Sequence, residues 1–210
     1  MDFIAQSAEV FEWVGSEKIL NAGSGGETCG LPEDQIYHLD ICAKNLPSSA
    51  RTFVGDVHDP PFADSFFDIT VCVGSVLNYC DAAVAIGSLA RVTKPGGKLF
   101  VEFECSWALD YLFRKEFKKN VALAETFYDT HKVRLWSFSE SFIEGILSAS
   151  GFNVVKRSHA HLFSSLVQRI TGNPNFAARF FCLDRLLRRI PMLSSYCSNV
   201  IFFCEKHGTV

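Results

Sequence analysis

The sequence predicts an α/β fold built on a doubly wound, mostly parallel sheet with helices on both faces. Short apolar runs alternate with segments of helical spacing, as in βαβ units. The runs are apolar almost throughout, which is typical of strands buried on both faces. The first four end in Gly or Asp, so the residues at their carboxyl ends are the place to look for a ligand.

Each element follows from a local pattern. Strands are predicted over 18–22 (ending in glycines), 35–39 (ending at Asp40), 51–54 (ending at Gly55-Asp56), 67–73 (ending at Gly74), 98–103, 153–157 and 200–205. Helices are predicted over 3–15, closed by Gly15, over 81–92, and over 139–150 between a capping Ser139 and Gly151.

Composition limits the function classes. The 210 residues suit one domain, with 48% apolar and 20% charged residues, which argues against disorder. A net charge of −3 argues against a chain-wide nucleic-acid interface. We expect no transmembrane segment and no secretory signal, because no long apolar run occurs and acids precede the first Lys. Eight Cys without a CxxC pair predict a reduced, cytoplasmic protein without a metal site.

Three strand ends carry the chemistry. The first gives Asn21-Ala22-Gly23-Ser24-Gly25-Gly26, where glycine lets the backbone approach a ligand, although Thr28 breaks the dinucleotide fingerprint GxGxxG. Asp40 could accept both hydroxyls of a ribose, or cap the next helix as a solvated Asp. Asp56 could accept from an adenine amine with Val57 against the ring, or form an Asx turn. Together they describe a pocket for an adenosine-bearing ligand.

At this point the chain resembles the class I S-adenosylmethionine-dependent methyltransferases, with a type 11-like domain. The carrying segments are KILNAGSGGE (18–27), YHLDI (37–41), 53–81 and LARVTKPGGKLFVEFE (89–104). The resemblance implies a seven-stranded sheet with its last strand antiparallel, and S-adenosylmethionine as cofactor. It also implies that the cofactor contacts Asn21, Ala22, Gly23, Ser24, Gly25, Asp40, Ile41, Asp56, Val57, Gly74 and Ser75.

The chain departs from the family pattern near the first strand. Asn21 stands where the family often has an acid, and Glu27 where it often has a further glycine. The segments joining the first three strands are short and contain Pro32 and Pro47. We therefore expect the usual first helix to be truncated or replaced by loop.

Methyl transfer needs alignment more than a universal catalytic residue. Asn78 and Tyr79, just beyond the fourth strand, are the candidates for orienting a substrate; alternatively, Asn78 is a cap and Tyr79 a packed aromatic. His58 is expected near the adenine, and not as a base. His131, His159 and His161 occupy segments that usually build the substrate side, and Glu104 could reach the pocket from the fifth strand.

Two segments of this single domain, 1–210, are predicted to cap the substrate side. Residues 105–138 are rich in aromatic side chains and suit either a lid or plain helix packing. Residues 159–198 are basic and include a predicted helix over 175–190. Its predicted apolar face is Phe176, Phe180, Leu183, Leu187 and Ile190, opposite Arg185, Arg188 and Arg189. Such a helix suits either contact with an anionic membrane or a docked cap with a solvated basic face.

The sequence therefore predicts a methyltransferase that acts on a small-molecule or lipid- or saccharide-linked acceptor. One alternative is a non-catalytic cofactor-binding or partner module with the same fold. A nicotinamide-dependent oxidoreductase is a further alternative, which the incomplete glycine fingerprint disfavours.

Overall fold

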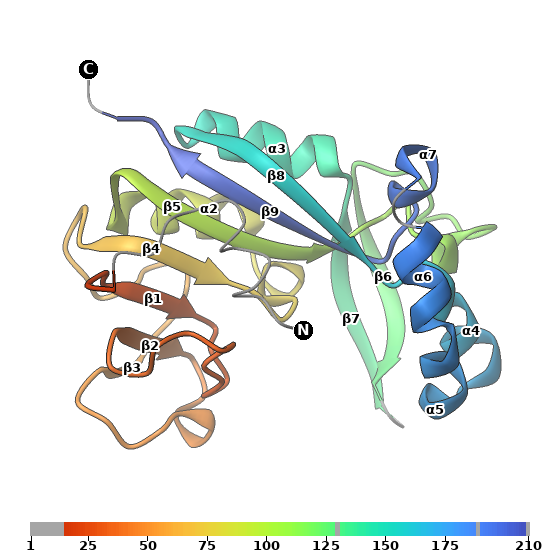
Figure 1. The fold of residues 1–210 in the computed structure, drawn as a ribbon, viewed down its shortest axis with the longest axis horizontal. Coiled ribbons are helices and arrows are strands. Elements are labelled where there is room, and N and C mark those ends of the chain that lie inside the picture. Colours follow the sequence, from red (N-terminus) through yellow and green to blue (C-terminus); the bar gives the residue numbers. More distant parts are fainter. Residues whose placement is uncertain (1–14, 129–130, 188–189, 209–210) are drawn as a thin grey trace. The chain divides into compact units, whose positions relative to one another are not determined.

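The computed structural model describes residues 15–128, 131–187 and 190–208 (Figure 1). The helix predicted over 3–15 therefore lies outside the described residues, apart from Gly15. No helix in this described part is long and apolar enough to cross a membrane.

Seven strands form one sheet in the order β3-β2-β1-β4-β5-β9-β8. The strands β1 to β5 are parallel, whereas the last strand, β9, is antiparallel (Figure 1). Their bounds are β1 Ile19–Ala22, β2 Ile36–Asp40, β3 Thr52–Val54, β4 Phe67–Cys72, β5 Thr93–Glu104, β8 Phe152–Ala160 and β9 Asn199–Lys206. The predicted fold class is confirmed, and every predicted strand has its counterpart.

The central strands are buried on both faces, as their apolar runs predicted. All four residues of β1 are buried, and β4 is buried at every position except Asp68. The fifth strand starts earlier than predicted, because Thr93 already pairs with Phe67 before the chain turns at Gly96. A hydrogen bond of 2.7 Å between the Thr70 and Thr93 hydroxyls satisfies both polar groups inside this core.

Helices flank only part of the sheet. Helix α2 (Ala82–Val92) begins at Asp81, whose side chain accepts from the amides of Ala83 and Val84. Helix α3 (Glu140–Ala149) begins after Ser139, whose hydroxyl accepts from the amide of Phe142. Both capping residues supply the acceptor that the first helical turn lacks.

The crossovers between β1, β2 and β3 contain no α-helix; their one regular element is the short 3-10 helix η1 (Ala43–Asn45). This confirms the expected loss of the first helix. The two crossovers touch at Gly26, which has φ +84°, and a Cβ there would collide with the Asn45 carbonyl oxygen. A glycine is therefore required where two loops replace the helix.

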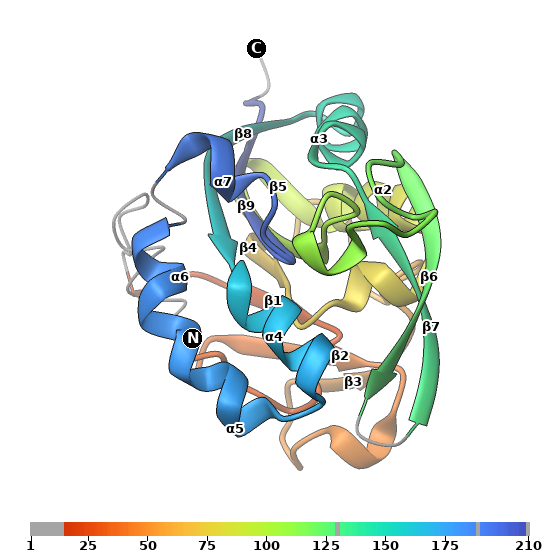
Figure 2. The ribbon, with the colours of Figure 1, turned by 90° about the vertical axis from the view of Figure 1, so that its right-hand side faces the viewer.

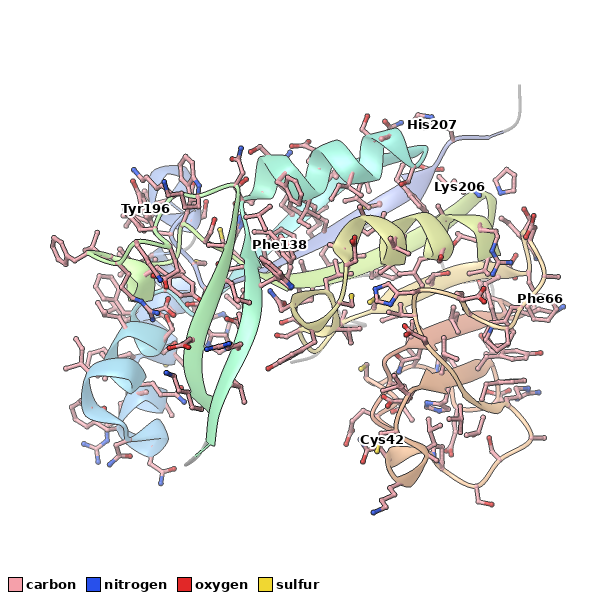
Figure 3. The ribbon with its side chains drawn as sticks, turned by 180° about the vertical axis from the view of Figure 1, so that it is seen from behind. Cys42, Phe66, Phe138, Tyr196, Lys206 and His207 are labelled. Carbon is pink, nitrogen blue, oxygen red and sulfur yellow. The ribbon has the colours of Figure 1, made fainter. Side chains whose placement is uncertain are left out.

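Aromatic rings and one lysine pack at the edge of the sheet that lies opposite the carboxyl ends of the parallel strands. Tyr37, Phe62, Phe66 and Phe67 form edge-on and stacked ring pairs with centroids 4.9–6.3 Å apart (Figure 3). Lys206, at the end of β9, donates to the carbonyl oxygens of Ala90 and Thr93 at 2.6 and 2.7 Å. These two hydrogen bonds connect the end of β9 to the junction between α2 and β5.

The chain divides into two compact units. The first unit comprises residues 1–102, 145–156 and 202–210, and the second comprises 103–144 and 157–201. All the strand ends predicted to bind the cofactor belong to the first unit. Both predicted cap segments, 105–138 and 159–198, lie entirely in the second unit.

The second unit holds a β-hairpin and a group of short helices (Figure 2). The hairpin pairs β6 (Val121–Tyr128) with β7 (His131–Phe138), and 3-10 helix η3 spans Leu109–Tyr111. In β7 exposed Lys132, Arg134 and Trp136 alternate with Val133, Leu135 and Ser137, which point inward. The helix packing considered for 105–138 is thus replaced by a hairpin, which this alternation of polar and apolar residues could have indicated.

The basic segment is helical, but its faces differ from those predicted. It contains α4 (Phe163–Thr171), α5 (Pro174–Ala177), 3-10 helix η4 (Ala178–Phe180), α6 (Phe181–Leu187) and α7 (Pro191–Ser194). The inward positions include Ala177 and Asp184, whereas Phe176 and Leu183 of the predicted apolar face are exposed. Asp184 turns inward because it accepts from the amides of Phe163 and Ser164 and from the Ser164 hydroxyl, which caps α4.

Candidate cofactor site

The predicted site residues gather at the carboxyl ends of β1, β2, β3 and β4, all within the first unit. The strand order runs outward from β1 through β2 on one side and through β4 on the other. Ligands of doubly wound sheets bind beyond the strand ends at such a reversal of order. The topology therefore brings together residues from 21 to 79.

The loop after β1 is held by its own backbone. The amides of Gly23 and Ser24 both donate to the carbonyl of Leu39, at 2.8 and 3.1 Å. Gly23 has φ +68°, and a Cβ there would collide with the side chain of Val76. The absence of a side chain at Gly23 therefore allows the loop to lie close to the segment after β4.

The side chain of Asn21 stabilises the loop that follows β1. Its side chain is buried, and its amide donates to the carbonyl oxygen of Glu27 at 2.7 Å. Its neighbour Ala22 is also buried, at the end of β1. The structure thus gives Asn21 a bond within the loop that an acid could not make, since a carboxylate has no proton to donate.

Asp40 connects two of the loops. One carboxylate oxygen accepts from the amide of Gly25 and the other from the amide of Cys42, each at 2.8 Å. A carboxylate oxygen can accept more than one hydrogen bond, so both retain capacity for ribose hydroxyls. The adjacent Ile41 is 74% exposed, an apolar surface that a flat ring would cover.

Asp56 is held by His58 at the end of β3. Its Oδ1 accepts from the backbone amide of His58 and lies 2.9 Å from its Nδ1. The backbone hydrogen bond, and then the side-chain contact with His58, hold the pKa of Asp56 below its ordinary value. Val57 between them is buried.

His58 also reaches the start of helix α2. Its Nε2 accepts from the amide of Asp81 at 3.0 Å, which assigns the ring proton to Nδ1, facing Asp56. Its carbonyl accepts from the Ser88 hydroxyl at 2.6 Å. His58, which was expected near the adenine, thus orients the carboxylate of Asp56. It can do so because its contact with the amide of Asp81, at the start of α2, fixes the ring.

The segment after β4 supplies the other side. The Gly74 amide donates to Glu102 of β5 at 2.9 Å, and Ser75 adopts φ +62°. Asn78 and Tyr79 follow in the 3-10 helix η2 (Val76–Tyr79), but they differ in accessibility. Asn78 is fully buried, whereas Tyr79 is largely exposed, so only Tyr79 is placed to meet a ligand without rearrangement. Glu102 was not predicted at the site.

The candidates outside this cluster have other partners. His159 Nε2 lies 3.0 Å from Glu140 Oε1, and His161 Nδ1 lies 3.3 Å from the Ser164 hydroxyl. Glu104 accepts from the Tyr111 hydroxyl at 3.4 Å. All of these contacts lie within the second unit, and the side chain of His131 is outside the described set.

The cysteines of the site are poor nucleophiles. Burial raises the pKa of the Cys72 thiol, and burial also raises that of Cys80 to about 12. Both thiols are therefore protonated at neutral pH. We find no cluster of three metal-ligating side chains among the residues described.

A hollow of about 550 Å³ in the second unit has the wrong character for an adenosine pocket. Charged side chains line it, and they already pair with one another: Arg114 with Glu116, and Arg134 with Glu125. Because these four charges neutralise one another within the two ion pairs, they attract a charged ligand only weakly.

The first unit, in contrast, fits S-adenosylmethionine. Asp40 can hold the ribose, exposed Ile41 can cover one face of the adenine, and Asp56 can accept from its amine. Gly23 lets the loop after β1 pack against Val76, since a Cβ there would collide with that side chain. The two carboxylate acceptors and the apolar surface of Ile41 thus match the polar groups and the ring of the nucleoside.

Comparison with known proteins agrees with this geometry. A family model described as "Methyltransferase domain" matches residues 20–101, which span β1 to β5. A demethylmenaquinone methyltransferase of Streptomyces avermitilis is 31% identical over 97 residues, covering 41% of this chain and 42% of that protein. A ubiquinone/menaquinone biosynthesis C-methyltransferase UbiE of Stutzerimonas stutzeri is 34% identical over 74 residues, covering 35% and 28%. The chain thus spans less than half the length of these relatives.

Solved structures share the fold over the whole chain. An S-adenosylmethionine-dependent methyltransferase from Mesorhizobium loti has a TM-score of 0.63 at 14% identity and covers 98% of this chain and 97% of its own. One from Methanosarcina mazei has a TM-score of 0.63 at 17% identity and covers both chains fully, at 100% each. Residues 20–101 thus match a methyltransferase family model, and the chain shares the fold of solved S-adenosylmethionine-dependent methyltransferases.

Proposed function

We propose that this chain transfers a methyl group from S-adenosylmethionine to a small-molecule or lipid-linked acceptor. The observation that carries the proposal is the arrangement of Asp40, Asp56 and the glycine loop at three neighbouring strand ends. When bound, the cofactor supplies a methyl group that is already activated on a sulfonium. The task left to the protein is to bind, align and exclude water.

The roles of the residues follow from their positions. Asp40 and Asp56 fix the nucleoside at its two polar edges, and Ile41 and Val57 supply apolar contact. The bonds from Gly25 and Cys42 keep the Asp40 carboxylate from rotating away. Gly74 and Ser75 line the methionine side through their backbone. Preorganised groups of this kind lose little entropy when the ligand binds.

Tyr79 is the candidate for orienting the acceptor. Its exposed position in η2 lets the phenol meet a substrate, whereas Asn78 is buried beneath it. The acceptor atom attacks the methyl carbon as the bond from that carbon to sulfur breaks. A hydroxyl or carbon acceptor must also lose a proton, and the phenol could hold that acceptor by a hydrogen bond.

The relatives favour an apolar acceptor. Those named above carry names that refer to demethylmenaquinone or to ubiquinone and menaquinone, which are quinones. An apolar or lipid-linked ring is therefore the acceptor class that we propose to test first.

Binding is tested by calorimetric titration with S-adenosylhomocysteine. We expect wild-type protein to bind, and Asp40→Ala to bind at least about tenfold more weakly, since a hydrogen bond to a charged group contributes about 1.5–3 kcal/mol. Asp34→Ala is the matched control, because Asp34 is an exposed acid in the preceding crossover. Absence of wild-type binding would favour the non-catalytic module, and preferential binding of NAD would favour the oxidoreductase.

Transfer is tested with radiolabelled S-adenosylmethionine and demethylated quinols as acceptors. We expect labelled product, and we expect Tyr79→Phe to lower kcat about tenfold or more while S-adenosylhomocysteine affinity is retained. Val84→Ala, at an exposed position on α2, is the control. If the protein binds the cofactor but transfers no methyl group to any quinol, the proposed quinol acceptor is wrong, and other acceptors must be tested.

A further inference from the structure

The charges of the chain are divided unevenly between the two units. The first unit contains 8 Lys or Arg and 15 Asp or Glu, a net charge of −7. The second contains 12 Lys or Arg and 8 Asp or Glu, a net charge of +4. The modest total charge therefore conceals a basic unit, which an anionic surface would attract.

Several of these cations take part in no ion pair among the described residues. Acids of the second unit pair with Arg114, Lys132, Arg134 and Arg157. Among the described residues, no carboxylate lies within ion-pair distance of Lys115, Lys118, Lys119, Arg179 or Arg185. Lys118 instead lies over the rings of Trp107, Phe117 and Tyr196.

Large apolar side chains are exposed among these cations. Phe113 is 96% exposed, and its φ of +67° places it in a conformation that a side chain rarely adopts. Two cations, Arg114 and Lys115, follow it directly. A ring held in water next to positive charge is the pattern of residues that enter the boundary between headgroups and acyl chains.

The helical segment from α5 to α6 repeats this combination. Its inward positions include Ala177 and Asp184, which leaves Arg179, Arg185 and Leu186 on the outside. Leu186 is 63% exposed, and Ile170 at the end of α4 is 74% exposed. Arginine and leucine thus share one outer face, as in helices that lie in the plane of a membrane surface.

These elements belong to one side of the second unit. Helix α4 contacts η3, which ends two residues before Phe113, and it also contacts α5 and α6. Figure 2 shows α4, α5, α6 and the segment around η3 on the side that faces the viewer, and in Figure 1 the same elements lie together at the right. We call the exposed set Phe113, Lys115, Ile170, Arg179, Arg185 and Leu186 the basic apolar face.

We propose that the basic apolar face docks the protein on an anionic lipid surface. Cations that take part in no ion pair provide attraction to acidic headgroups. The exposed Phe, Ile and Leu side chains supply apolar area to bury below the headgroups. Neither contribution requires methyl transfer, so this proposal stands apart from the proposed function.

The test is flotation of the whole chain with phosphatidylcholine vesicles, with or without phosphatidylserine. We expect binding only when phosphatidylserine is present, and weakening at high salt because exposed charges are screened. Arg179→Glu combined with Arg185→Glu should bind about tenfold more weakly or worse. Phe113→Ser should lose about tenfold through its apolar contribution.

Matched variants in the first unit are the controls. Lys44→Glu changes an exposed cation, and Val84→Ser changes an exposed apolar residue. Both should float like wild type. Thermal melting and S-adenosylhomocysteine titration of every variant separate a loss of membrane binding from a loss of folding or of cofactor binding.

Three results would overturn the proposal. Wild type could fail to float with phosphatidylserine, or float equally well without it. The variants of the basic apolar face could bind no worse than the controls. Finally, light scattering could show a dimer that Phe113→Ser dissociates while wild type ignores vesicles, in which case a second copy of the chain covers this face.

Discussion

The two units differ in how their polar groups are used. In the first, the acids at the strand ends are held by backbone amides: Asp40 by Gly25 and Cys42, and Asp56 by His58. In the second, several cations and large apolar side chains are exposed to solvent. Rigid, prearranged acceptors suit a small ligand of defined shape, whereas an exposed basic and apolar surface suits an anionic lipid surface whose shape varies. Binding one cofactor and meeting a variable surface thus place opposite demands on side chains.

The largest expected effect is in the first unit, from Gly26→Ala. A Cβ at Gly26 collides with the Asn45 carbonyl oxygen, and φ +84° is strained for alanine. We expect a loss of about 3 kcal/mol in the free energy of unfolding, with cofactor binding abolished. Chemical denaturation and calorimetry measure the two effects.

Gly25→Ala is the matched control for this substitution. Gly25 also has positive φ, +55°, but its Cβ would meet nothing within 4 Å. Only the conformational cost remains, about 1–2 kcal/mol. Equal losses in the two variants would mean that the contact between the crossovers does not stabilise the site.

An intermediate effect is expected in the second unit, from Asp184→Ala. Removing this buried acid leaves the amides of Phe163 and Ser164 and the Ser164 hydroxyl without their acceptor. We expect a loss of about 2–3 kcal/mol, localised to α4, where hydrogen exchange should rise. Cofactor affinity should stay near the wild-type value, because the site lies in the first unit.

Asp184→Asn is the control, since its amide oxygen keeps one acceptor and should retain part of the stability. If Asp184→Ala abolished S-adenosylhomocysteine binding in a protein that remains folded, the separation of the two units in function would be wrong.

The smallest effect concerns pH. The pKa of Asp56 is lowered, chiefly by the His58 amide and then by the His58 side chain. The ionised form therefore persists as pH falls below the ordinary Asp value, and its contribution to stability and binding is lost only near the lowered pKa. His58→Gln removes the side-chain contribution and keeps the backbone one.

Calorimetric titration of S-adenosylhomocysteine at descending pH should show the affinity of His58→Gln falling at a higher pH than that of wild type. His207→Gln, at an exposed position near the end of β9, should follow wild type. Identical profiles for His58→Gln and wild type would show that the side chain of His58 does not tune Asp56.

The sequence by itself determined the sheet and its ligand edge. Continuous apolar runs specify strands buried on both faces, and Gly or Asp after β1 to β4 marks where those strands end. The helix cap Ser139 was readable for the same reason, because a cap acts on residues two or three positions away. Local patterns were sufficient wherever the interaction was local.

Only the tertiary structure decided the contacts between distant residues. The collision that requires glycine at position 26 comes from Asn45, and the bond that turns Asp184 inward comes from α4. His58 acquires its orientation from Asp81 of a later element. Such contacts depend on how the elements pack against one another, and the spacing of apolar residues along the chain carries no information about that packing. For this reason the spacing predicted an apolar inward face over 175–190, whereas the structure buries the acid Asp184 there.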